Sequence, residues 1–493
     1  MESTTGLTYK SAAGRWVIAA TVLGSGMALI DTTVVGIALP TIGRSFAASV
    51  GTLQWIVTGY TLTLAALLLL GGSLGDRYGR RLVFCIGIAW FALSSAACGF
   101  APDSTALIVA RVVQGVGAAL LTPGSLAILQ ASFSPADRGR AIGAWSGLGG
   151  LAAAAGPLLG GYLIAAASWR WIFFINIPLG VAVLVFAMRH VPESRGTDAV
   201  GHIDVPGAVV GMFALAAVAY GLIEGPERGF DSVEVILVLA AGVISGVAFV
   251  FVERARTAPM LPLGLFANRQ FSVTNGVTLI VYAALGGALF ILPVELQVVN
   301  RYTPFEAGAS LIPLTVVMLL LSARSGQLAA RIGPRLQMGL GPIVVGAGLA
   351  LLIPSTGSRS YVTGVLPAML VFSLGLAITV APLTTTALGA APREHAGIAS
   401  AVNNYVARVG SLLAVAVLPA LAGISGRSYA HPGALSVEFR KAMVITAAMC
   451  VAGGVIAALG IRNPEGLVGL RSKSPRHEGL QRSHDAPSPA EES

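Results

Sequence analysis

Two charged residues, Asp31 and Arg111, lie inside long apolar stretches of this sequence. A charge at the centre of a bilayer costs about 2.5–3.5 kcal/mol on insertion scales, so it persists where it faces an aqueous cavity or a partner. A carboxyl group in such a place can take up and release a proton during a reaction cycle. Asp31 is therefore a candidate proton-coupling residue. Two alternatives stay open: Asp31 is held by the hydroxyls of Thr32 or Thr33, or it lies near the outer surface.

Arg111 is the complementary candidate. A guanidinium group keeps its charge at any physiological pH, so it must face a cavity or a carboxylate. Gln114 follows three residues later and falls on the same helical face. We therefore expect Arg111 to tune Asp31 and Gln114 to line the cavity beside them. The alternative is an arginine that only ties helix ends together.

Glu295 and Gln297 close another apolar run. Glu295 either adds a second proton-coupling site or reaches the outer membrane interface, and Gln297 is a candidate for the substrate cavity. The six histidines have no metal-binding spacing, and none of Lys10, Lys441 and Lys473 follows a glycine-rich turn that could hold ATP. We expect no metal, no cofactor and no enzymatic reaction. A proton gradient is then the energy source.

The elements that position these residues are membrane spans. The chain has 493 residues, of which 55% are hydrophobic and 11% charged, as is typical of a polytopic membrane protein. Only helices or closed barrels satisfy the backbone in lipid, and strand-type alternation is absent. We predict fourteen helices, with approximate bounds 16–39, 52–71, 82–101, 105–130, 141–166, 170–188, 205–223, 233–252, 271–297, 305–323, 336–354, 361–387, 396–423 and 441–461. An even number places both termini on one side.

A short polar turn, residues 72–81, separates the second and third of these spans. Arginine-rich short loops stay in the cytoplasm, so the net charge of +9 orients the chain and does not indicate nucleic acid. Residues 326–335 repeat the turn between the tenth and eleventh spans, with Ala330 in place of the acid Asp76. This repeat predicts two six-helix halves.

The turn resembles the signature loop of the major facilitator superfamily. The stretch around Arg111 resembles the second motif of that superfamily. The stretch around Asp31, where Gly36 replaces the usual asparagine, resembles the helix-one motif of its fourteen-span drug:proton antiporters. The resemblance implies an all-α membrane protein with two six-helix bundles and an inserted hairpin. The implied segments are an N-terminus at 1–15, bundles at 16–189 and 261–462, the hairpin and its linker at 190–260, and a disordered tail at 463–493.

The resemblance also implies the gating residues. A glycine and proline pattern in the fifth span is similar to the antiporter motif, although Ala152 replaces one of its glycines, and it provides a kink and a smooth packing face. In the 72–81 turn, Asp76 is expected to hold the cytoplasmic side shut in the outward-facing state through the start of the thirteenth span. The gating candidates are Gly72, Asp76, Arg77, Gly79, Arg80, Gly156, Pro157, Gly160 and Gly161.

Similar stretches in the second and thirteenth spans supply further substrate-cavity candidates, namely Trp55, Tyr60 and Asn403. The implied function is proton-driven export of amphipathic, drug-like or antibiotic compounds by a monomer in the bacterial cytoplasmic membrane, with both termini in the cytoplasm. The expected partners are the small organic substrate, protons and the lipid bilayer. A transporter of one specific metabolite and a membrane sensor that moves nothing are the alternatives.

Overall fold

The computed structural model describes residues 6–196, 204–256, 259, 261–391, 396–424 and 431–463. The predicted disordered tail lies outside these residues from position 464 onward. Thirteen described segments are long and apolar enough to cross a membrane. The one predicted span that is not among these thirteen is the eleventh, 336–354, which corresponds to α13 (Pro334–Leu351) and packs between α14 and α17. The all-helical prediction and its order of spans are therefore confirmed, with shifted boundaries.

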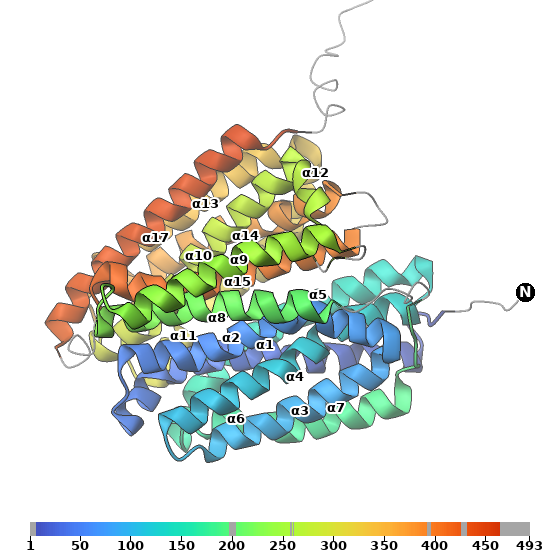
Figure 1. The fold of residues 1–493 in the computed structure, drawn as a ribbon, viewed down its shortest axis with the longest axis horizontal. Helices are drawn as coiled ribbons and strands as arrows, with labels where there is room; N and C mark the ends of the chain where they lie inside the picture. The colour runs from blue at the N-terminus through green and yellow to red at the C-terminus, as the bar shows by residue number, and fades with distance from the viewer. Residues whose placement is uncertain are drawn as a thin grey trace, which may run out of the picture.

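The first half of the chain forms one bundle, coloured blue to teal in Figure 1. Its helices are α1 (Ala12–Phe46), α2 (Val50–Tyr78), α3 (Arg80–Phe100), α4 (Ser104–Ser132), α5 (Pro135–Ala166), α6 (Trp171–Phe174) and α7 (Asn176–His190). The short α6 and the longer α7 together make the sixth span. We call this bundle the N half.

The second bundle is yellow to red and follows an inserted hairpin. It contains α10 (Arg269–Val298), α11 (Pro304–Ala309), α12 (Ile312–Ile332), α13, α14 (Leu366–Gly389), α15 (Ala396–Ala422) and α17 (Pro432–Gly460), with short turns η1 (Leu263–Ala267) and η2 (Tyr361–Val365). We call this bundle the C half. The last span begins at Pro432, nine residues before the predicted start at 441, because Pro432 is suited to the first helical turn.

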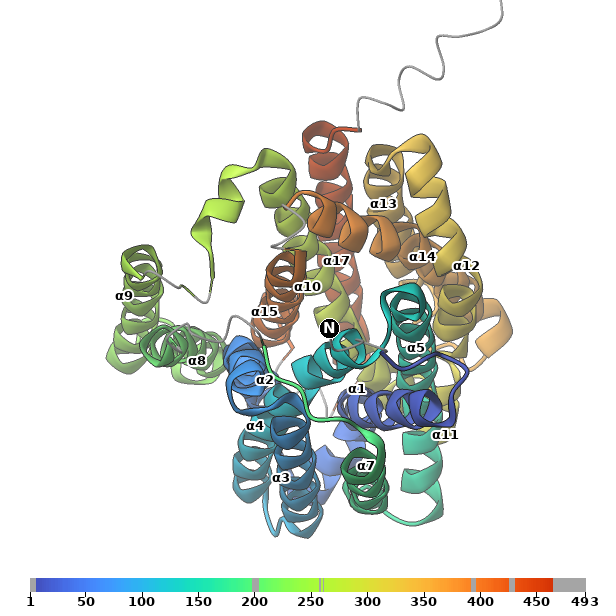
Figure 2. The same ribbon diagram turned by 90° about the vertical axis from the view of Figure 1, so that its right-hand side faces the viewer.

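The hairpin consists of α8 (Val205–Arg228) and α9 (Val233–Ala255). Figure 2 shows both helices to one side of the two bundles, with α8 next to α2 and α15 and α9 further out. The hairpin does not separate the two halves. It leaves the α1, α4 and α10 region at the centre of the molecule, where the candidate site lies.

The two halves repeat the same turn. Gly79 ends α2 with a φ of 125°, and Gly333 ends α12 with a φ of 86°, conformations that favour glycine. Each turn is capped by a residue that follows the last helix of its half. Glu193 accepts hydrogen bonds from the backbone N–H of Arg81 at 3.0 Å, and Asn463 accepts one from the backbone N–H of Arg335 at 3.1 Å. The repeat predicted from the sequence is thus built into both halves.

The halves meet at the end of the molecule opposite these turns. Gln54 donates to the carbonyls of Val415 and Ala416 at 2.6 and 3.0 Å, and Gln297 donates to the carbonyl of Ile37 at 2.9 Å. Within the described residues, the hydrogen bonds that join the two halves all lie at this end. One continuous apolar core joins α1, α10, α14 and α17 here. In Figure 1 the halves converge on the left and diverge on the right. We call the joined end the outer seal.

Candidate functional site

Asp31 and Arg111 form a buried ion pair. Arg111 Nη1 donates to Asp31 Oδ2 at 2.5 Å and to Gln114 Oε1 at 2.7 Å, while Gln114 Nε2 donates to Asp31 Oδ1 at 2.9 Å. Both side chains of the pair are 1% exposed. The structure therefore brings three of the predicted residues into one closed network between α1 and α4, which we call the Asp31 network.

Aromatic rings complete the surroundings of the network. The Tyr60 ring centre lies 4.2 Å from the Arg111 guanidinium carbon, and the Phe173 ring centre lies 5.8 Å from it. Arg111 Nε also donates to the carbonyl of Ile56 at 3.2 Å. Burial removes water from the Arg111 guanidinium group, and the two aromatic rings and the Asp31 carboxylate compensate for that loss. Tyr60, predicted to line the cavity, is buried against Arg111 in this state.

The threonines that follow Asp31 do not hold its carboxylate. Thr32 Oγ1 donates to the carbonyl of Ala28 at 2.9 Å, and Thr33 Oγ1 donates to the carbonyl of Ile30 at 3.0 Å. Threonines within a helix commonly bond back to the preceding turn. The hydrogen bonds to the carboxylate come from Arg111 and Gln114 of α4, so the environment of the carboxylate changes whenever α1 and α4 move relative to each other.

Both oxygens of the Asp31 carboxylate serve as hydrogen-bond acceptors in this arrangement. An ionised Asp only accepts hydrogen bonds, and both Asp31 oxygens accept one here. Protonation would convert one acceptor into a donor facing the amide or the guanidinium, and it would leave Arg111 as an uncompensated buried cation. Proton loading and a rearrangement of this network are therefore linked chemically.

Glu295 lies apart from this network. Its side chain is buried in α10, and neither carboxylate oxygen has a hydrogen-bond partner among the described residues. Gln297, two residues further on, bridges to Ile37 in the outer seal. A buried carboxyl group without a partner is costly when charged, so Glu295 stays a candidate second proton site.

The other cavity candidates are divided between helix pairs. Trp55 Nε1 donates to Glu224 at 3.0 Å, which places Trp55 on the side of α2 that packs against α8. Asn403 Nδ2 donates to Thr278 Oγ1 at 2.8 Å and to Asn275 Oδ1 at 3.1 Å, between α15 and α10. The structure thus places neither side chain in the Asp31 network.

The glycines and proline of α5 are in close contact with neighbouring helices. A Cβ on Gly160 would lie 2.8 Å from Val34 of α1, and one on Gly156 would meet Thr33 of the same helix. A Cβ on Gly161 would lie 2.6 Å from the carbonyl of Pro304 in α11. The predicted motif therefore faces α1 on one side and the C half on the other, and its gating role stays a prediction.

The 72–81 turn is held within its own half. Arg80 Nε donates to Asp76 Oδ1 at 2.8 Å, and the backbone N–H of Gly196 donates to the Asp76 carbonyl at 2.9 Å. The Arg77 guanidinium lies 5.7 Å from the centre of the Tyr78 ring, and a Cβ on Gly72 would make only ordinary contact with Pro123. Arg80, rather than Arg77, orients the Asp76 carboxylate in this state.

Comparison with known proteins identifies the family. Residues 21–415 match the Major Facilitator Superfamily. The chain belongs to this superfamily. Its members are transporters, and this one is a multi-pass membrane protein with two six-helix bundles and an inserted hairpin.

Relatives of this major facilitator transporter include named resistance proteins. Multidrug resistance protein Stp of Mycobacterium tuberculosis H37Rv is 36% identical over 400 residues, covering 81% of this chain and 74% of that protein. The tetracenomycin C resistance and export protein of Streptomyces glaucescens is 37% identical, with coverages of 82% and 74%. The methylenomycin A resistance protein of Bacillus subtilis 168 is 34% identical, with coverages of 86% and 91%.

Solved structures share the fold of this major facilitator transporter at low identity. A bacterial homologue of the human lysosomal transporter Spinster has a TM-score of 0.66 and 16% identity, covering 92% of this chain and 97% of that one. The peptide transporter POT in complex with sulfate has a TM-score of 0.68 and 13% identity, with coverages of 93% and 98%.

Sequence reasoning missed two functional candidates in this major facilitator transporter. Arg408 lies in α15, and its charge acts on the hydroxyls of Tyr60 and Tyr282, yet no carboxylate of the described residues is within ion-pair distance. Its position inside a predicted span was the available signal. Glu193, which caps the 72–81 turn, gave no signal because it lies in a polar segment more than a hundred residues away.

Arg111→Ala is expected to impair transport severely, because it leaves the Asp31 carboxylate buried without its cation. Removing one partner of a buried pair costs about 3–5 kcal/mol, equivalent to a loss of at least about 100-fold. Arg111→Lys should restore activity only in part. The planar guanidinium group of Arg111 donates to Asp31, Gln114 and Ile56 at once, and the single ammonium group of a lysine cannot. Initial transport rates in vesicles check both. Full activity of Arg111→Lys would show that the charge alone is enough and that the guanidinium geometry is not needed.

Asp76→Asn is expected to shift the transporter toward the state that is open on the side of the 72–81 turn. A carboxylate at a helix N-terminus contributes up to about 2 kcal/mol, which corresponds to up to about a thirtyfold change in population. The predicted partner is the start of α15 near Gly397. Maleimide labelling of Asn404→Cys, an exposed position on α15, should rise in the Asp76→Asn background. Unchanged labelling at equal expression would show that Asp76 does not hold the two halves together and only belongs to the turn that orients the chain in the membrane.

Proposed function

We propose that this chain is a secondary active transporter that exports amphipathic organic compounds, antibiotics among them, in exchange for protons. The named relatives support the substrate class, because they include multidrug, tetracenomycin C and methylenomycin A resistance proteins. The proposed location is the bacterial cytoplasmic membrane, with both termini in the cytoplasm. The proposed working unit is a monomer without a cofactor.

One observation carries the proton-coupling part of the proposal: the buried carboxylate of Asp31, bound by Arg111 and Gln114. A sensor or scaffold gains nothing from the cost of burying this pair. A transporter gains a switch, because protonation of Asp31 weakens the contacts of α1 with α4. Glu295 is proposed as a second proton site in the C half, since it is buried without a partner in the described chain.

The proposed mechanism is alternating access. With the termini in the cytoplasm, the outer seal lies on the external side, and the two halves diverge toward the cytoplasmic side (Figure 1). A compound would enter between the halves near the Asp31 network and Arg408. Rocking of the two halves would then break the outer seal and close the cytoplasmic side, and proton uptake from the external side would accompany release of the compound.

A panel of toxic compounds tests the proposed function in a host that lacks its own exporters. Cells that express the chain should survive higher concentrations of several structurally unrelated amphipathic compounds than cells with an empty vector. The Asp31→Asn variant at equal membrane levels should give no protection. Protection against a single polar compound would instead indicate a transporter of one metabolite, and no change for any compound would contradict export.

A further inference from the structure

A cavity of about 910 Å³ lies in the C half, away from the Asp31 network. Its walls come from the segment between α10 and α11, from the first turns of α12, and from the beginning of η2 and α14. It sits beside α11, on the C-half side of the outer seal. Neither the proton coupling nor the substrate path proposed above uses this cavity.

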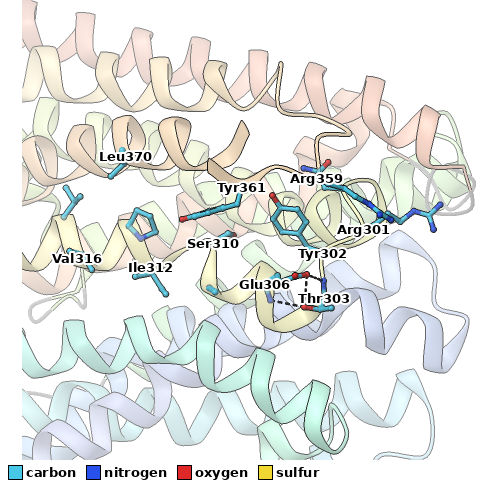
Figure 3. Close-up of a pocket in the computed structure, with 14 residues that line it drawn as sticks. Arg301, Tyr302, Thr303, Glu306, Ser310, Ile312, Val316, Arg359, Tyr361 and Leu370 are labelled. Atoms are coloured by element: carbon cyan, nitrogen blue, oxygen red, sulfur yellow. Dashed lines mark hydrogen bonds between the residues drawn. The ribbon is translucent and has the colours of Figure 1, made fainter. Parts of the chain in front are cut away.

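The cavity has a charged end and an apolar end. Figure 3 shows Arg301 and Arg359 at one end, and the apolar side chains of Ile312, Val316 and Leu370 at the other. Tyr302 and Tyr361 lie between the two ends. From Tyr361 to Leu370 the helix rises by roughly 13 Å, so the apolar end reaches well into the membrane from the polar rim.

Two features of the rim point to a ligand. The Tyr302 hydroxyl is buried and has no hydrogen-bond partner among the described residues. Burial, together with the charge of Glu306, raises the pKa of the Tyr302 phenol, so the group stays protonated and can donate. Arg301 has a φ of 62°, a conformation that favours glycine and that costs free energy in an arginine.

The charges of the rim favour an anion. Glu306 is occupied by its own turn, because its carboxylate accepts hydrogen bonds from the backbone N–H and the hydroxyl of Thr303 at 2.7 and 3.0 Å. Arg301 and Arg359 form no ion pair with a carboxylate of the described residues. The exposed side chains of Val316, Leu319 and Leu320 on α12 place bilayer lipid directly beside the apolar end.

We propose that this cavity binds an anionic phospholipid of the external leaflet. Its phosphate lies between Arg301 and Arg359 and accepts a hydrogen bond from Tyr302, and the upper part of one acyl chain lies along Ile312, Val316 and Leu370. Arginine forks suit phosphate, and such charge-assisted hydrogen bonds are about twice as strong as neutral ones. The inference uses the membrane orientation proposed above but not the identity of the transported compound.

Thermal unfolding of the purified full-length protein in detergent tests this site without any transport measurement. Dioctanoyl phosphatidylglycerol should raise the midpoint, whereas dioctanoyl phosphatidylcholine and inorganic phosphate at equal concentrations should not. Arg301→Gln and Arg359→Gln should each weaken the apparent affinity for phosphatidylglycerol by at least about tenfold. Arg324→Gln, in the second half of α12 and outside the cavity lining, is the matched control and should leave the affinity unchanged.

The Arg301→Gly variant distinguishes the effect of the positive charge from the effect of the backbone conformation at this position. It should raise the midpoint in the absence of lipid, because glycine adopts the positive φ without cost, and it should lose the response to phosphatidylglycerol. Equal protection by inorganic phosphate would make this a site for a soluble anion. Equal protection by phosphatidylcholine, or a full response in the Arg301→Gln, Arg359→Gln double variant, would overturn the lipid site.

Discussion

Asp31→Asn should reduce export against a concentration gradient to the level of membranes without the protein. An amide has nearly the shape of the carboxyl group, but it cannot take up and release a proton. The amide oxygen can still accept the hydrogen bond from Gln114 Nε2, so the contact between α1 and α4 should survive although Arg111 loses its charged partner. Substrate binding is therefore expected to persist while uphill movement is lost. Transport into inverted vesicles energised by a pH gradient measures this.

Two control variants accompany that experiment. Asp31→Glu keeps a titratable carboxyl group and should retain part of the activity. Glu224→Gln removes a carboxylate from the pair with Arg228 at the end of α8, where no coupling role is proposed, and should transport normally. Uphill transport by Asp31→Asn at a rate close to the unmodified protein would show that the coupling proton binds elsewhere, with Glu295 as the next candidate.

Gly308→Leu should keep the outer seal from closing. A Cβ at this position in α11 would meet the Pro157 carbonyl of α5, which is backbone and cannot move aside as a side chain could. Overpacking costs typically about 1–3 kcal/mol, so we expect the outward-open population to rise by roughly 5-fold to 150-fold. The variant should leak protons and lose net export.

Labelling by a membrane-impermeant maleimide measures the opening. The reporter is a cysteine at Ala38, which is fully buried in the core beneath the seal, in a background without Cys85, Cys98 and Cys450. Labelling from outside should rise in Gly308→Leu. In Gly246→Leu, where the added side chain meets nothing within 4 Å, it should not. Equal labelling in both variants would show that the contact between α5 and α11 does not govern the seal.

For the outer seal, the sequence indicated the motif of α5 but not the residue that it contacts. The motif of α5 stood out because its glycines and proline recur at fixed spacing, and the structure places that helix against α1 and α11. The partner residue Gly308 could not be predicted, since a lone glycine beside a capping turn has no special pattern. Gly156, one of the gating candidates, faces Thr33 of its own half. Which side of a helix meets which neighbour depends on the tertiary packing.

The Asp31 network was the more predictable part. An acid and an arginine inside apolar spans are expensive, so each must have a partner or a cavity, and the sequence therefore indicated that Asp31 and Arg111 act together. The direction of Trp55 was not predictable, because an aromatic side chain suits a cavity and a helix contact equally well. The caps of the two repeated turns came from Glu193 and Asn463, whose sequence surroundings are polar and without periodicity.

Proton movement driven by the transported compound tests the central proposal most directly. The purified protein is placed in liposomes that contain a pH-sensitive dye, and a compound from the susceptibility panel is added outside with equal pH on both sides. Exchange predicts that the entering compound drives protons out, so the interior pH rises, and that Asp31→Asn shows no rise. Entry of the compound without any change of interior pH, or the same rise in Asp31→Asn, would contradict proton exchange at Asp31.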